Sequence, residues 1–429
     1  MIAAVRSTVF RGQLRSQLRC FAYVPPTFST PEKVAIIGSG SFGSAAALSV
    51  ARNAARFDFC DSEVRMYTFE EEITVGDGVV SFPETEKLSR IINKKHENPK
   101  YLPGVKLPDN LVSCPDLLTA CLDATLLIFV MPFQFLKPLL PTVRKVMDPE
   151  ARGVSLIKEV HFDEETLGVK LISKQIQDGL SFKKETDGRD RKFPCGVLMG
   201  ANIASEIANG DFSESTLATR FRVNEEGDDL NEKTRIVLNN TESFRVYSIR
   251  DVEGCEACGA LKNVIAIGAG FVDGLGMGSN TKAALMRIGI QEMERFCNDF
   301  LDGVEPSTFS ESCGMADLIT TCVGGRNRKC GEIFAKAVIN GAPLSWDSIE
   351  EDHLNGQRLR GVKTTKQVHE LLQSQDLLRL YPLFSKIYSI AYDGEPVDSI
   401  IDGLYIPNEV IMTKNGSNRV EIEEVTTTA

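Results

Sequence analysis

Short apolar runs alternate with helical patterns along the first half of the chain. Helical segments, the first of which is the alanine-rich stretch 44–55, separate these runs. The runs have the length of buried strands and lie at residues 33–37, 64–69, 124–130, 154–157 and 197–199. The alternation continues to about residue 210 and predicts an α/β fold, with helices packed on a mainly parallel sheet.

From about residue 251 the pattern changes, and helical segments follow one another without strands. They lie at residues 256–270, 281–301, 332–340, 361–374 and 382–393. We therefore expect a sheet domain over residues 32–250 and a mainly α-helical domain over residues 251–412. The charged runs 183–192 and 225–233 predict solvated loops.

The composition is that of an ordinary globular protein. Of the 429 residues, 42% are hydrophobic and 25% are charged, which argues against wholesale disorder or a fibrous repeat. The formal net charge of −11 argues against a general nucleic-acid binder, because such a protein needs a basic surface. The longest apolar run, 124–131, is far shorter than the ~20 residues of a membrane helix, so no membrane span is expected.

The eleven cysteines and four histidines lack the spacing of a disulfide framework or a metal site. An odd cysteine count in a chain of this length favours reduced thiols. The one C-x-x-C sequence, Cys255 to Cys258, leads directly into a helical segment. We expect these two thiols to be packing residues, with a metal or redox role as the weaker alternative, and we expect no metal cofactor.

The two ends of the chain differ from the rest. Residues 1–31 contain Arg6, Arg11, Arg15 and Arg19, no lysine and no acid, with apolar residues in between. This is the composition of an organelle transit peptide. We expect import into an organelle, with the mitochondrion favoured over the plastid; a dispensable extension on a cytoplasmic protein is the alternative. Residues 413–429 predict a loose polar tail.

A glycine-rich segment follows the first predicted strand and opens the first predicted helix. It reads Gly38-Ser39-Gly40-Ser41-Phe42-Gly43. In this context the first glycine permits a tight turn, the second lets the backbone approach a pyrophosphate, and the third allows close packing of helix on strand. The segment predicts a Rossmann-like domain that binds a dinucleotide, and a glycine turn in some other α/β unit is the alternative.

An acidic cluster, residues 70–72, ends the second predicted strand. An acid at this position can bind ribose hydroxyls and repel a 2′-phosphate, which favours NAD over NADP. It lies about thirty residues beyond the glycines instead of the usual ~20, which implies a longer connection over residues 53–63. A solvated acidic helix start is the equally plausible alternative.

Two lysines lie in apolar surroundings. Lys158 ends the predicted strand 154–157, at the edge where open α/β sheets bind ligands. Lys262 is flanked along its helical segment by apolar residues. A lysine in such surroundings loses proton affinity and can serve as a general base. For either lysine alone, a surface position with a buried aliphatic stem is the competing interpretation.

The segment 324–329, Gly-Gly-Arg-Asn-Arg-Lys, is locally basic in an acidic protein. Arg326 can grip a phosphate with two hydrogen bonds while Asn327 adds another, although a solvated loop is an equal alternative. Residues 200–204 directly follow a predicted strand and so are expected to line the cofactor cleft. The segment 312–321 precedes the basic one and is expected to bring Asp317 and Thr321 near it.

Several of these segments together resemble the NAD-dependent glycerol-3-phosphate dehydrogenases of the eukaryotic soluble type. The resemblance spans roughly residues 33–405, and the GALKN and GGRNRK sequences are its most specific parts. The matching segments are GSGSFGSA at 38–45, SLIK at 155–158, LMGANIASE at 198–206, CGALKNVIAIGAGFVDGLG at 258–276, NTKAALMR at 280–287, ESCGMADLITTCVGGRNRK at 311–329 and LNGQ at 354–357.

The resemblance implies reversible hydride transfer between NAD and C2 of sn-glycerol 3-phosphate, a small phosphorylated substrate, in a homodimeric enzyme. It makes Lys262 the general acid and base, with Lys158 and Asp317 also catalytic. The substrate-binding positions that it implies are Lys158, Asn202, Asn263, Thr321, Arg326 and Asn327. The cofactor-binding positions are Gly38, Ser39, Gly40, Ser41, Phe42, Gly43, Phe69, Phe135, Ala204, Arg326, Arg358 and Arg360.

The chain departs from the family pattern at several of these positions. Ser41 and Phe42 replace an asparagine and a tryptophan, and Phe133 replaces a histidine; Glu159 replaces a glycine, Arg358 a lysine and Arg360 a glutamine. The new base at 360 weakens the case for a strict preference for NAD.

Two other functions remain open from the sequence. One is a dehydrogenase of similar build that acts on a hydroxyacid, which has no need of the GGRNRK segment. The other is a catalytically inactive NAD-binding sensor. The presence of Lys262, Asn263 and Asp317 together counts against the sensor.

Overall fold

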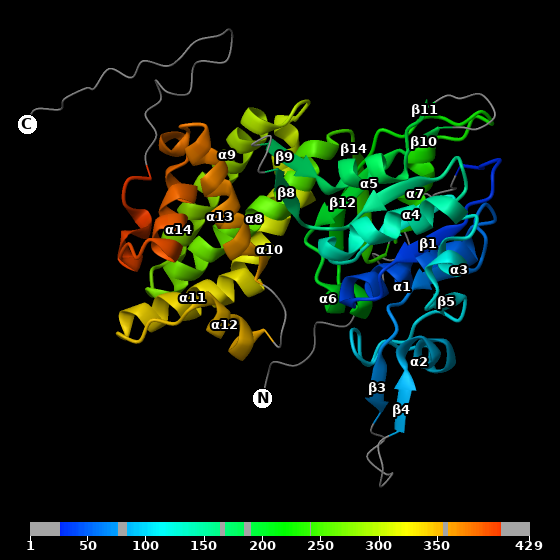
Figure 1. The fold of residues 1–429 in the computed structure, drawn as a ribbon, viewed down its shortest axis with the longest axis horizontal. Helices are drawn as coiled ribbons and strands as arrows, with labels where there is room; N and C mark the ends of the chain where they lie inside the picture. The colour runs from blue at the N-terminus through cyan, green and yellow to red at the C-terminus, as the bar shows by residue number, and fades with distance from the viewer. Residues whose placement is uncertain are drawn as a thin grey trace, which may run out of the picture.

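The structure is a computed structural model that describes residues 26–75, 84–163, 168–183, 190–240, 242–354 and 359–404. Figure 1 shows a sheet domain beside a domain built almost entirely of helices, as the sequence predicts. Three expected features lie outside the described residues: the arm up to residue 25, the tail from residue 413 onward, and Arg358.

The sheet domain is organised around one eight-stranded sheet. The five expected strands are present, at β1 (Val34–Ile37), β2 (Val64–Tyr67), β6 (Leu126–Phe129), β7 (Arg152–Ser155) and β12 (Cys195–Gly200). The strand order is β14-β13-β12-β7-β6-β1-β2-β5, and every neighbouring pair is parallel except β12 with β13. The carboxyl ends of β1, β2, β6, β7 and β12 therefore share one edge of the sheet.

The sheet extends further along the chain than the apolar runs predict. Three strands of this sheet were not expected: β5 (Leu111–Cys114), β13 (Ser213–Ala218) and β14 (Phe244–Ile249). β13 and β14 together continue the sheet almost forty residues past the predicted end of the alternation at about residue 210. They escaped the pattern because β13 reads Ser-Glu-Ser-Thr-Leu-Ala, and β14 alternates buried with exposed residues at the edge of the sheet.

Alternate residues of the central strands β1 and β6 belong to two different cores. In β1, Val34 and Ile36 pack into one core, and Ala35 and Ile37 pack into the other. The first core lies under α1 (Ser41–Arg56), α2 (Leu88–Lys95), α6 (Ala204–Asn209) and α7 (Leu230–Leu238). The second lies under α3 (Leu117–Cys121), α4 (Leu136–Val146) and α5 (Ile172–Leu180). Period-two burial on both faces is what makes the strands continuously apolar.

A long buried helix, α8 (Val252–Gly274), forms the centre of the helical domain. Cys255 and Cys258 are both fully buried on it, in keeping with a packing role. The surrounding helices are α9 (Ser279–Phe300), α10 (Asp317–Gly324), α11 (Arg326–Ile339), α12 (Trp346–His353), α13 (Arg360–Ser374) and α14 (Pro382–Tyr392). The five expected helical segments correspond to α8, α9, α11, α13 and α14, although α11 begins six residues earlier than expected.

By length and composition α8 is also apolar enough to cross a membrane, and it is the one helix in the described part of the chain that passes this test. Its apolar window is completely buried inside the protein. The core helix of a folded domain has the same properties, which makes α8 a weak indication of a span. The sequence of α8 contains no long uninterrupted apolar run, because charged residues such as Glu256 and Lys262 interrupt it.

The charged run 225–233, expected to be a solvated loop, is instead partly helical and partly buried. α7 begins at Leu230, and Lys233 is only 1% exposed. Its Nζ atom donates to the carbonyl oxygen of Thr30 at 2.6 Å and lies 3.6 Å from Asp228 and 3.8 Å from Glu32. The loop prediction was wrong here because two buried carboxylates compensate the lysine, which charge patterning along the chain cannot reveal.

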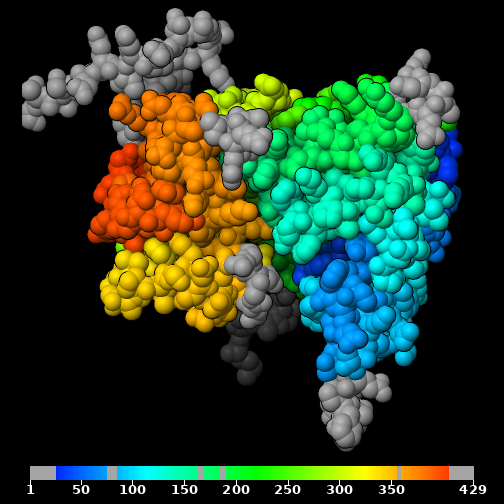
Figure 2. Space-filling model, in the orientation of Figure 1, coloured from blue at the N-terminus to red at the C-terminus, as the bar shows by residue number. Residues whose placement is uncertain are grey.

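Three small hairpins project from the sheet domain. They pair β3 (Glu72–Val75) with β4 (Glu84–Lys87), β8 (Val160–Asp163) with β9 (Gly168–Leu171), and β10 (Phe182–Lys183) with β11 (Asp190–Arg191). Figure 2 shows the β3–β4 hairpin standing out below the body of the domain. The alternative interpretation of residues 70–72 as a helix start is therefore wrong, because Glu72 begins a strand; within the run 183–192, short strands bracket residues 184–189, which lie outside the described residues.

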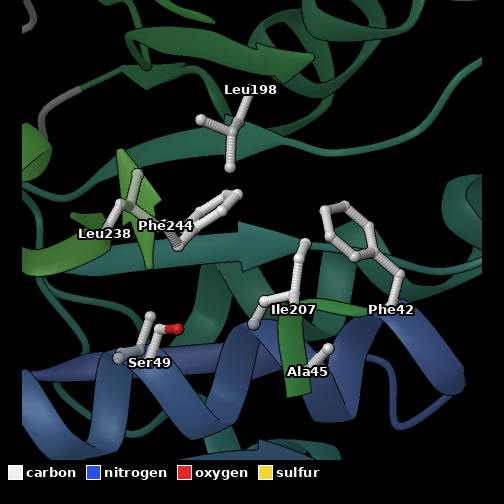
Figure 3. A pocket seen from close by; sticks show the side chains of 9 residues that line it. Phe42, Ala45, Ser49, Leu198, Ile207, Leu238 and Phe244 are labelled. Carbon is white, nitrogen blue, oxygen red and sulfur yellow. The ribbon is translucent and has the colours of Figure 1, made fainter. Parts of the chain in front are cut away.

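A small apolar cavity of about 10 Å³ lies between α1, α6 and the sheet (Figure 3). Figure 3 shows the ring of Phe42 directed into it beside Ile207, with Leu198 and Phe244 opposite. A space this small and this apolar is a packing gap rather than a ligand site. The side chain of Phe42 therefore belongs to the core, and a cofactor contact at this position remains a prediction for its backbone.

Candidate active site

The glycine loop lies where β1 ends and α1 begins. Gly38 has φ +125°, and a Cβ atom there would lie 2.5 Å from the carbonyl oxygen of Val130. A Cβ atom at Gly43 would lie 2.2 Å from the carbonyl oxygen of Gly38. By contrast, no atom lies within 4 Å of a Cβ at Gly40, the residue that caps α1 without a side-chain hydrogen bond. The loop is thus closed toward the protein and open toward a ligand, as binding of a pyrophosphate at a helix N-terminus requires.

A buried asparagine that the sequence gave no reason to select holds this loop in place. Asn98 is 0% exposed, and its Nδ2 atom donates to the carbonyl oxygen of Ser39 at 2.8 Å and to Oγ of Ser44 at 2.9 Å. Its Oδ1 atom accepts from the backbone N–H of Tyr101 at 3.1 Å. The side chain of Asn98, which lies more than fifty residues further along the chain, therefore holds the backbone of the loop at Ser39 and the hydroxyl of Ser44.

Two exposed aromatic side chains flank the loop at the same edge of the sheet. Phe69 follows β2 and is 71% exposed, and Phe135 follows β6 and is 54% exposed. Since β2 and β6 are the two neighbours of β1, these rings stand on either side of the glycine loop. Exposed rings beside an open anion site fit the flat ring systems of a dinucleotide. Ala204, also expected in this cleft, begins α6 just after β12.

The acidic cluster after β2 is engaged in contacts within the protein. Glu70 accepts hydrogen bonds from the backbone N–H and Oγ of Ser89 at 3.2 and 2.8 Å, at the start of α2. Glu71 accepts from the hydroxyl of Tyr101 at 2.7 Å and pairs with Lys100. Burial acts to raise the pKa of Glu71, but these hydrogen bonds outweigh it and lower the pKa overall. Glu71 is consequently a held, ionised acid near the end of β2.

The two predicted lysines meet at one carboxylate. Lys158 Nζ lies 2.8 Å from Oδ2 of Asp317 and 2.6 Å from the carbonyl oxygen of Gly200, at the end of β12. Lys262, on α8, contacts the other carboxylate oxygen of Asp317 and donates to Oγ1 of Thr321 at 2.9 Å. The structure thus brings together four of the predicted site residues, contributed by both domains.

Lys262 is strongly perturbed by this position. Its side chain is 6% exposed, and burial, the largest influence, lowers its pKa to about 8. The carboxylate of Asp317 opposes this shift, and the ammonium of Lys158 adds to it. Near neutral pH such a lysine is poised both to give and to accept a proton. The apolar neighbours of Lys262 in the sequence predicted this burial correctly.

A second group of predicted residues lies one helix away. Arg326 is the first residue of α11, so it lies on a helix rather than in a loop, and Gly325 caps that helix without a side-chain hydrogen bond. Asn327 Nδ2 donates to Oδ1 of Asn263 at 2.7 Å, and Asn327 Oδ1 accepts from the backbone N–H of Gly361 at 3.0 Å. An arginine at an open helix N-terminus is suited to binding a phosphate.

Asn202 carries a polar atom that the protein leaves unsatisfied. Its Oδ1 atom accepts from the hydroxyl of Ser215 at 2.8 Å, whereas its buried Nδ2 atom has no hydrogen-bond partner among the described residues. Leaving a buried donor unpaired costs about 1–3 kcal/mol. A bound ligand with an acceptor atom at this position would remove that cost, as expected of a substrate-binding residue.

Arg360, predicted as a cofactor contact, contacts another residue at which the chain departs from the family pattern. It is the first residue of α13, and its guanidinium lies 3.0 Å from the carboxylate of Glu159. Removal from water, the larger influence, and the nearby charge of Arg360 lower the pKa of Arg326. Arg360 therefore contacts the residue that directly follows Lys158, and so lies next to the lysine–carboxylate group of the site.

The fold and this arrangement define the class of protein. A Rossmann-like sheet with an open glycine loop is suited to binding a dinucleotide, and a buried lysine–carboxylate pair from a helical domain faces the same sheet edge. This is the construction of an oxidoreductase that uses a nicotinamide cofactor. The open glycine loop and the exposed rings of Phe69 and Phe135 fit that cofactor. The Asn202 Nδ2 atom, which has no partner among the described residues, fits a polar substrate.

Comparisons with known proteins give the family. Residues 33–224 match the N-terminal model, and residues 251–402 the C-terminal model, of NAD-dependent glycerol-3-phosphate dehydrogenase. The chain belongs to the family of NAD-dependent glycerol-3-phosphate dehydrogenases. It is therefore an NAD-using oxidoreductase, as the resemblance in the sequence implied.

Individual relatives agree over most of their length. The chain is 44% identical to the cytoplasmic glycerol-3-phosphate dehydrogenase [NAD(+)] of Homo sapiens over 86% of this chain and 96% of that one. It is 45% identical to the Cuphea lanceolata enzyme over 86% of this chain and 91% of that one. The solved structure of the Saccharomyces cerevisiae enzyme superposes with a TM-score of 0.76 at 38% identity, covering 87% of this chain and 99% of that chain.

Proposed function

We propose that the residues assembled around Asp317 interconvert sn-glycerol 3-phosphate and dihydroxyacetone phosphate. The single observation that carries this assignment is the burial of Lys262, with its pKa lowered to about 8, against a carboxylate at the cofactor edge of the sheet. When bound, NAD accepts a hydride from C2 of the substrate, or NADH returns it. The chain itself has to move one proton and stabilise one developing charge.

Lys262 is the proton carrier in this proposal. In the oxidation direction its neutral amine takes the proton of the C2 hydroxyl, and in the reduction direction its ammonium gives the proton back. Asp317 and Thr321 fix the Nζ atom by hydrogen bonds, so the side chain does not have to be ordered during the reaction. Lys158, on the other side of Asp317, lowers the pKa of Lys262 and adds positive charge near a developing alkoxide.

The phosphate of the substrate is held by the start of α11. Arg326 offers a guanidinium fork, Asn327 adds an amide, and the helix N-terminus, where Gly325 makes no side-chain cap, favours an anion. Asn263 orients Asn327, and Asn202 supplies its unpaired Nδ2 atom to an oxygen of the substrate.

The cofactor is held by the sheet domain. In this proposal residues 38–43 bind the pyrophosphate, Phe69 and Phe135 contact the ring systems, and Ala204 and Arg326 complete the cleft. The acid at Glu71 supports a preference for NAD over NADP. The boundary at residues 250 and 251 lies between the end of β14 and the start of α8, which supports the two-domain division proposed from the sequence.

A spectrophotometric assay tests the function directly. Dihydroxyacetone phosphate should oxidise NADH, and NADPH should be used less well. A hydroxyacid dehydrogenase would instead turn over hydroxyacids without need of a phosphate, and an NAD-binding sensor would bind NADH without turnover. Failure of purified protein to reduce dihydroxyacetone phosphate, with NADH binding intact, would overturn the proposal.

We also propose a homodimer, on the basis of the resemblance. An exposed apolar stripe on the helical domain, at a spacing of four residues, offers a surface for a second copy: Met315 is 43%, Ile319 44% and Val323 63% exposed. Sedimentation velocity should give twice the monomer mass, and Val323→Glu should shift the protein toward the monomer. A wild-type monomer at micromolar concentration would contradict this.

The basic arm supports organelle import, and the mitochondrion is the proposed destination. The human relative is named cytoplasmic, so import would distinguish this chain from it. A fluorescent reporter fused to residues 1–35 should enter mitochondria, and a matched fusion with the four arginines changed to glutamine should not. Diffuse fluorescence of the first fusion would contradict import, whereas fluorescence in a plastid would correct the organelle.

A further inference from the structure

Lys158 and Glu159 are consecutive residues of the sheet domain, and each contacts an oppositely charged residue of the helical domain. Lys158 Nζ lies 2.8 Å from Asp317, and Glu159 lies 3.0 Å from Arg360. We propose that these two ion pairs form an interdomain clamp, in which Glu159 and Arg360 are positioning residues that align Lys158 and the start of α13 around the substrate. The inference rests on the proposed function and names residues that the reaction itself does not use.

The order of the charges makes the clamp specific. On the sheet domain the cation Lys158 precedes the anion Glu159. The helical domain places the anion Asp317 opposite Lys158 and the cation Arg360 opposite Glu159. If the domains met in the exchanged register, Lys158 would face Arg360 and Glu159 would face Asp317, and both contacts would be repulsive. Two adjacent pairs of opposite polarity therefore favour one alignment of the two domains.

Arg360 is connected to the substrate-binding asparagines through the backbone. The residue after it, Gly361, donates its N–H to Asn327 Oδ1 at 3.0 Å, and Asn327 in turn donates to Asn263 at 2.7 Å. The backbone at Gly361 is closely packed against both asparagines, because a Cβ atom there would lie 2.6 Å from the carbonyl oxygen of Asn263 and 2.7 Å from Asn327 Oδ1. A shift of Arg360 is consequently passed to Asn327 and Asn263.

The pair also keeps the charge of the site balanced. Arg360 lies close enough to Arg326 to lower its pKa, so the two guanidinium groups repel each other. Glu159 compensates the charge of Arg360 and so reduces the repulsion between Arg360 and Arg326. This accounts for two departures from the family pattern at once, because an acid in place of glycine and a base in place of glutamine contact each other and cancel in charge.

A double-mutant cycle tests the clamp. The variants are Glu159→Gln, Arg360→Gln and the combination, assayed for kcat/KM with dihydroxyacetone phosphate, for the NADH dissociation constant by fluorescence, and for Tm. Each single variant should lower kcat/KM about two- to fivefold, the factor expected for a partly exposed ion pair. The double variant should lower it no further than the worse single variant. The loss should fade at high salt, and NADH affinity should stay within twofold of wild type.

A third interdomain ion pair, outside the clamp, provides the matched control. Arg220 follows β13 and pairs with Glu253 in the first turn of α8 at 2.6 Å, with side chains 43% and 26% exposed, against 38% and 23% for Arg360 and Glu159. The change Arg220→Gln should leave kcat/KM at the wild-type value. This separates a clamp at the substrate from general stabilisation of the domain contact.

The outcomes are distinguishable. Additive losses in the double variant, or an equal loss from Arg220→Gln, would overturn the clamp. A weakened NADH affinity in Arg360→Gln alone would overturn it as well, in favour of a direct cofactor contact at Arg360. Wild-type protein without dihydroxyacetone phosphate reduction would overturn the proposed function, whereas active wild type with an unaffected Glu159→Gln would overturn only the clamp.

Discussion

Lys262 and Asp317 form an ion pair that is almost completely removed from water, with side chains 6% and 3% exposed. The second oxygen of that carboxylate lies 2.8 Å from Nζ of Lys158. One carboxylate is therefore shared by two lysines from different domains. Because two positive charges share one negative charge in a low-dielectric position, the pair favours the release of one proton, and Lys262 is the more buried of the two.

The change Lys262→Ala should abolish most turnover and leave NADH binding largely intact. The cofactor is held by the glycine loop of the other domain, and the described residues within hydrogen-bond distance of Lys262 include no histidine to replace the base. Loss of a general base typically costs ~10²–10⁴-fold in rate. Single-turnover reduction of dihydroxyacetone phosphate, with NADH affinity measured by fluorescence on the same preparation, checks both statements.

A second buried lysine supplies the control for that experiment. Lys233 is 1% exposed, but it pairs with Asp228 and Glu32. The change Lys233→Met should lower the free energy of unfolding by about 3–5 kcal/mol, the cost of breaking a buried ion pair, with kcat of the folded fraction unchanged. Near-normal kcat in well-folded Lys262→Ala protein would show that Lys262, like Lys233, is only structural.

The rates of the two reaction directions should respond oppositely to pH. The pKa of Lys262 is about 8, so oxidation of the alcohol, which needs the neutral amine, should rise as pH passes 8. Reduction of the ketone needs the ammonium and should fall over the same range. Since the charge of Lys158 helps to lower this pKa, Lys158→Met should move the midpoint above 8. A midpoint unchanged by that substitution in the kcat/KM profile would contradict the coupling.

The change Arg326→Lys should damage substrate binding although it conserves the charge. Lysine lacks the planar fork that binds two phosphate oxygens, and losing a charge-assisted hydrogen bond costs about 1.5–3 kcal/mol. The KM for dihydroxyacetone phosphate should therefore rise roughly tenfold or more. Arg328→Lys on the same helix is the matched control, because Arg328 pairs with Asp273 and Glu332. Wild-type KM and kcat in Arg326→Lys would remove Arg326 from the site.

The change Asn98→Ala should weaken cofactor binding without touching the cofactor. Two hydrogen bonds from its amide hold Ser39 of the glycine loop and Ser44 in the first turn of α1, and each is worth about 0.5–1.5 kcal/mol. The NADH dissociation constant should rise by about tenfold. Asn53→Ala is the control: its buried amide ties α1 to the carbonyl oxygens of Val237 and Asn239, so it should lower Tm with little effect on NADH affinity. Equal effects of both changes on NADH affinity would contradict the assigned role of Asn98.

Local sequence was sufficient where a pattern and its cause lie within a few residues. The strand at residues 34–37 and the glycine turn after it are of this kind, because apolar continuity and the absence of side chains act locally. The strand β13 was not predicted because its polar sequence carries little strand signal. Its pairing with β12 and β14 makes it a strand. Hydrogen bonds to neighbouring strands, which the apolar pattern does not reveal, therefore determine this part of the sheet.

The site shows the same division. The apolar neighbours of Lys262 in its own helix made its burial predictable from the sequence. Nothing in the sequence around Asn98 indicates its role, which depends on the contact with Ser39 that the fold creates. The contact between Glu159 and Arg360 joins residues two hundred positions apart, and no spacing rule reaches that far. Long-range partners therefore had to come from the structure, in the sheet and in the site alike.

The hydrogen bonds of Ser29 and Thr30 limit how short a mature chain can be. Both backbone N–H groups donate to the carboxylate of Asp228, at 2.8 and 3.1 Å, and the carbonyl oxygen of Thr30 receives Lys233. Residues 29 and 30, which the charge pattern alone assigned to the arm of residues 1–31, are thus attached to the sheet domain. If the arm is an import signal as proposed, a cut after Thr30 would remove three donors to Asp228 and two acceptors of Lys233, so the processed chain should be more stable when it retains Ser29.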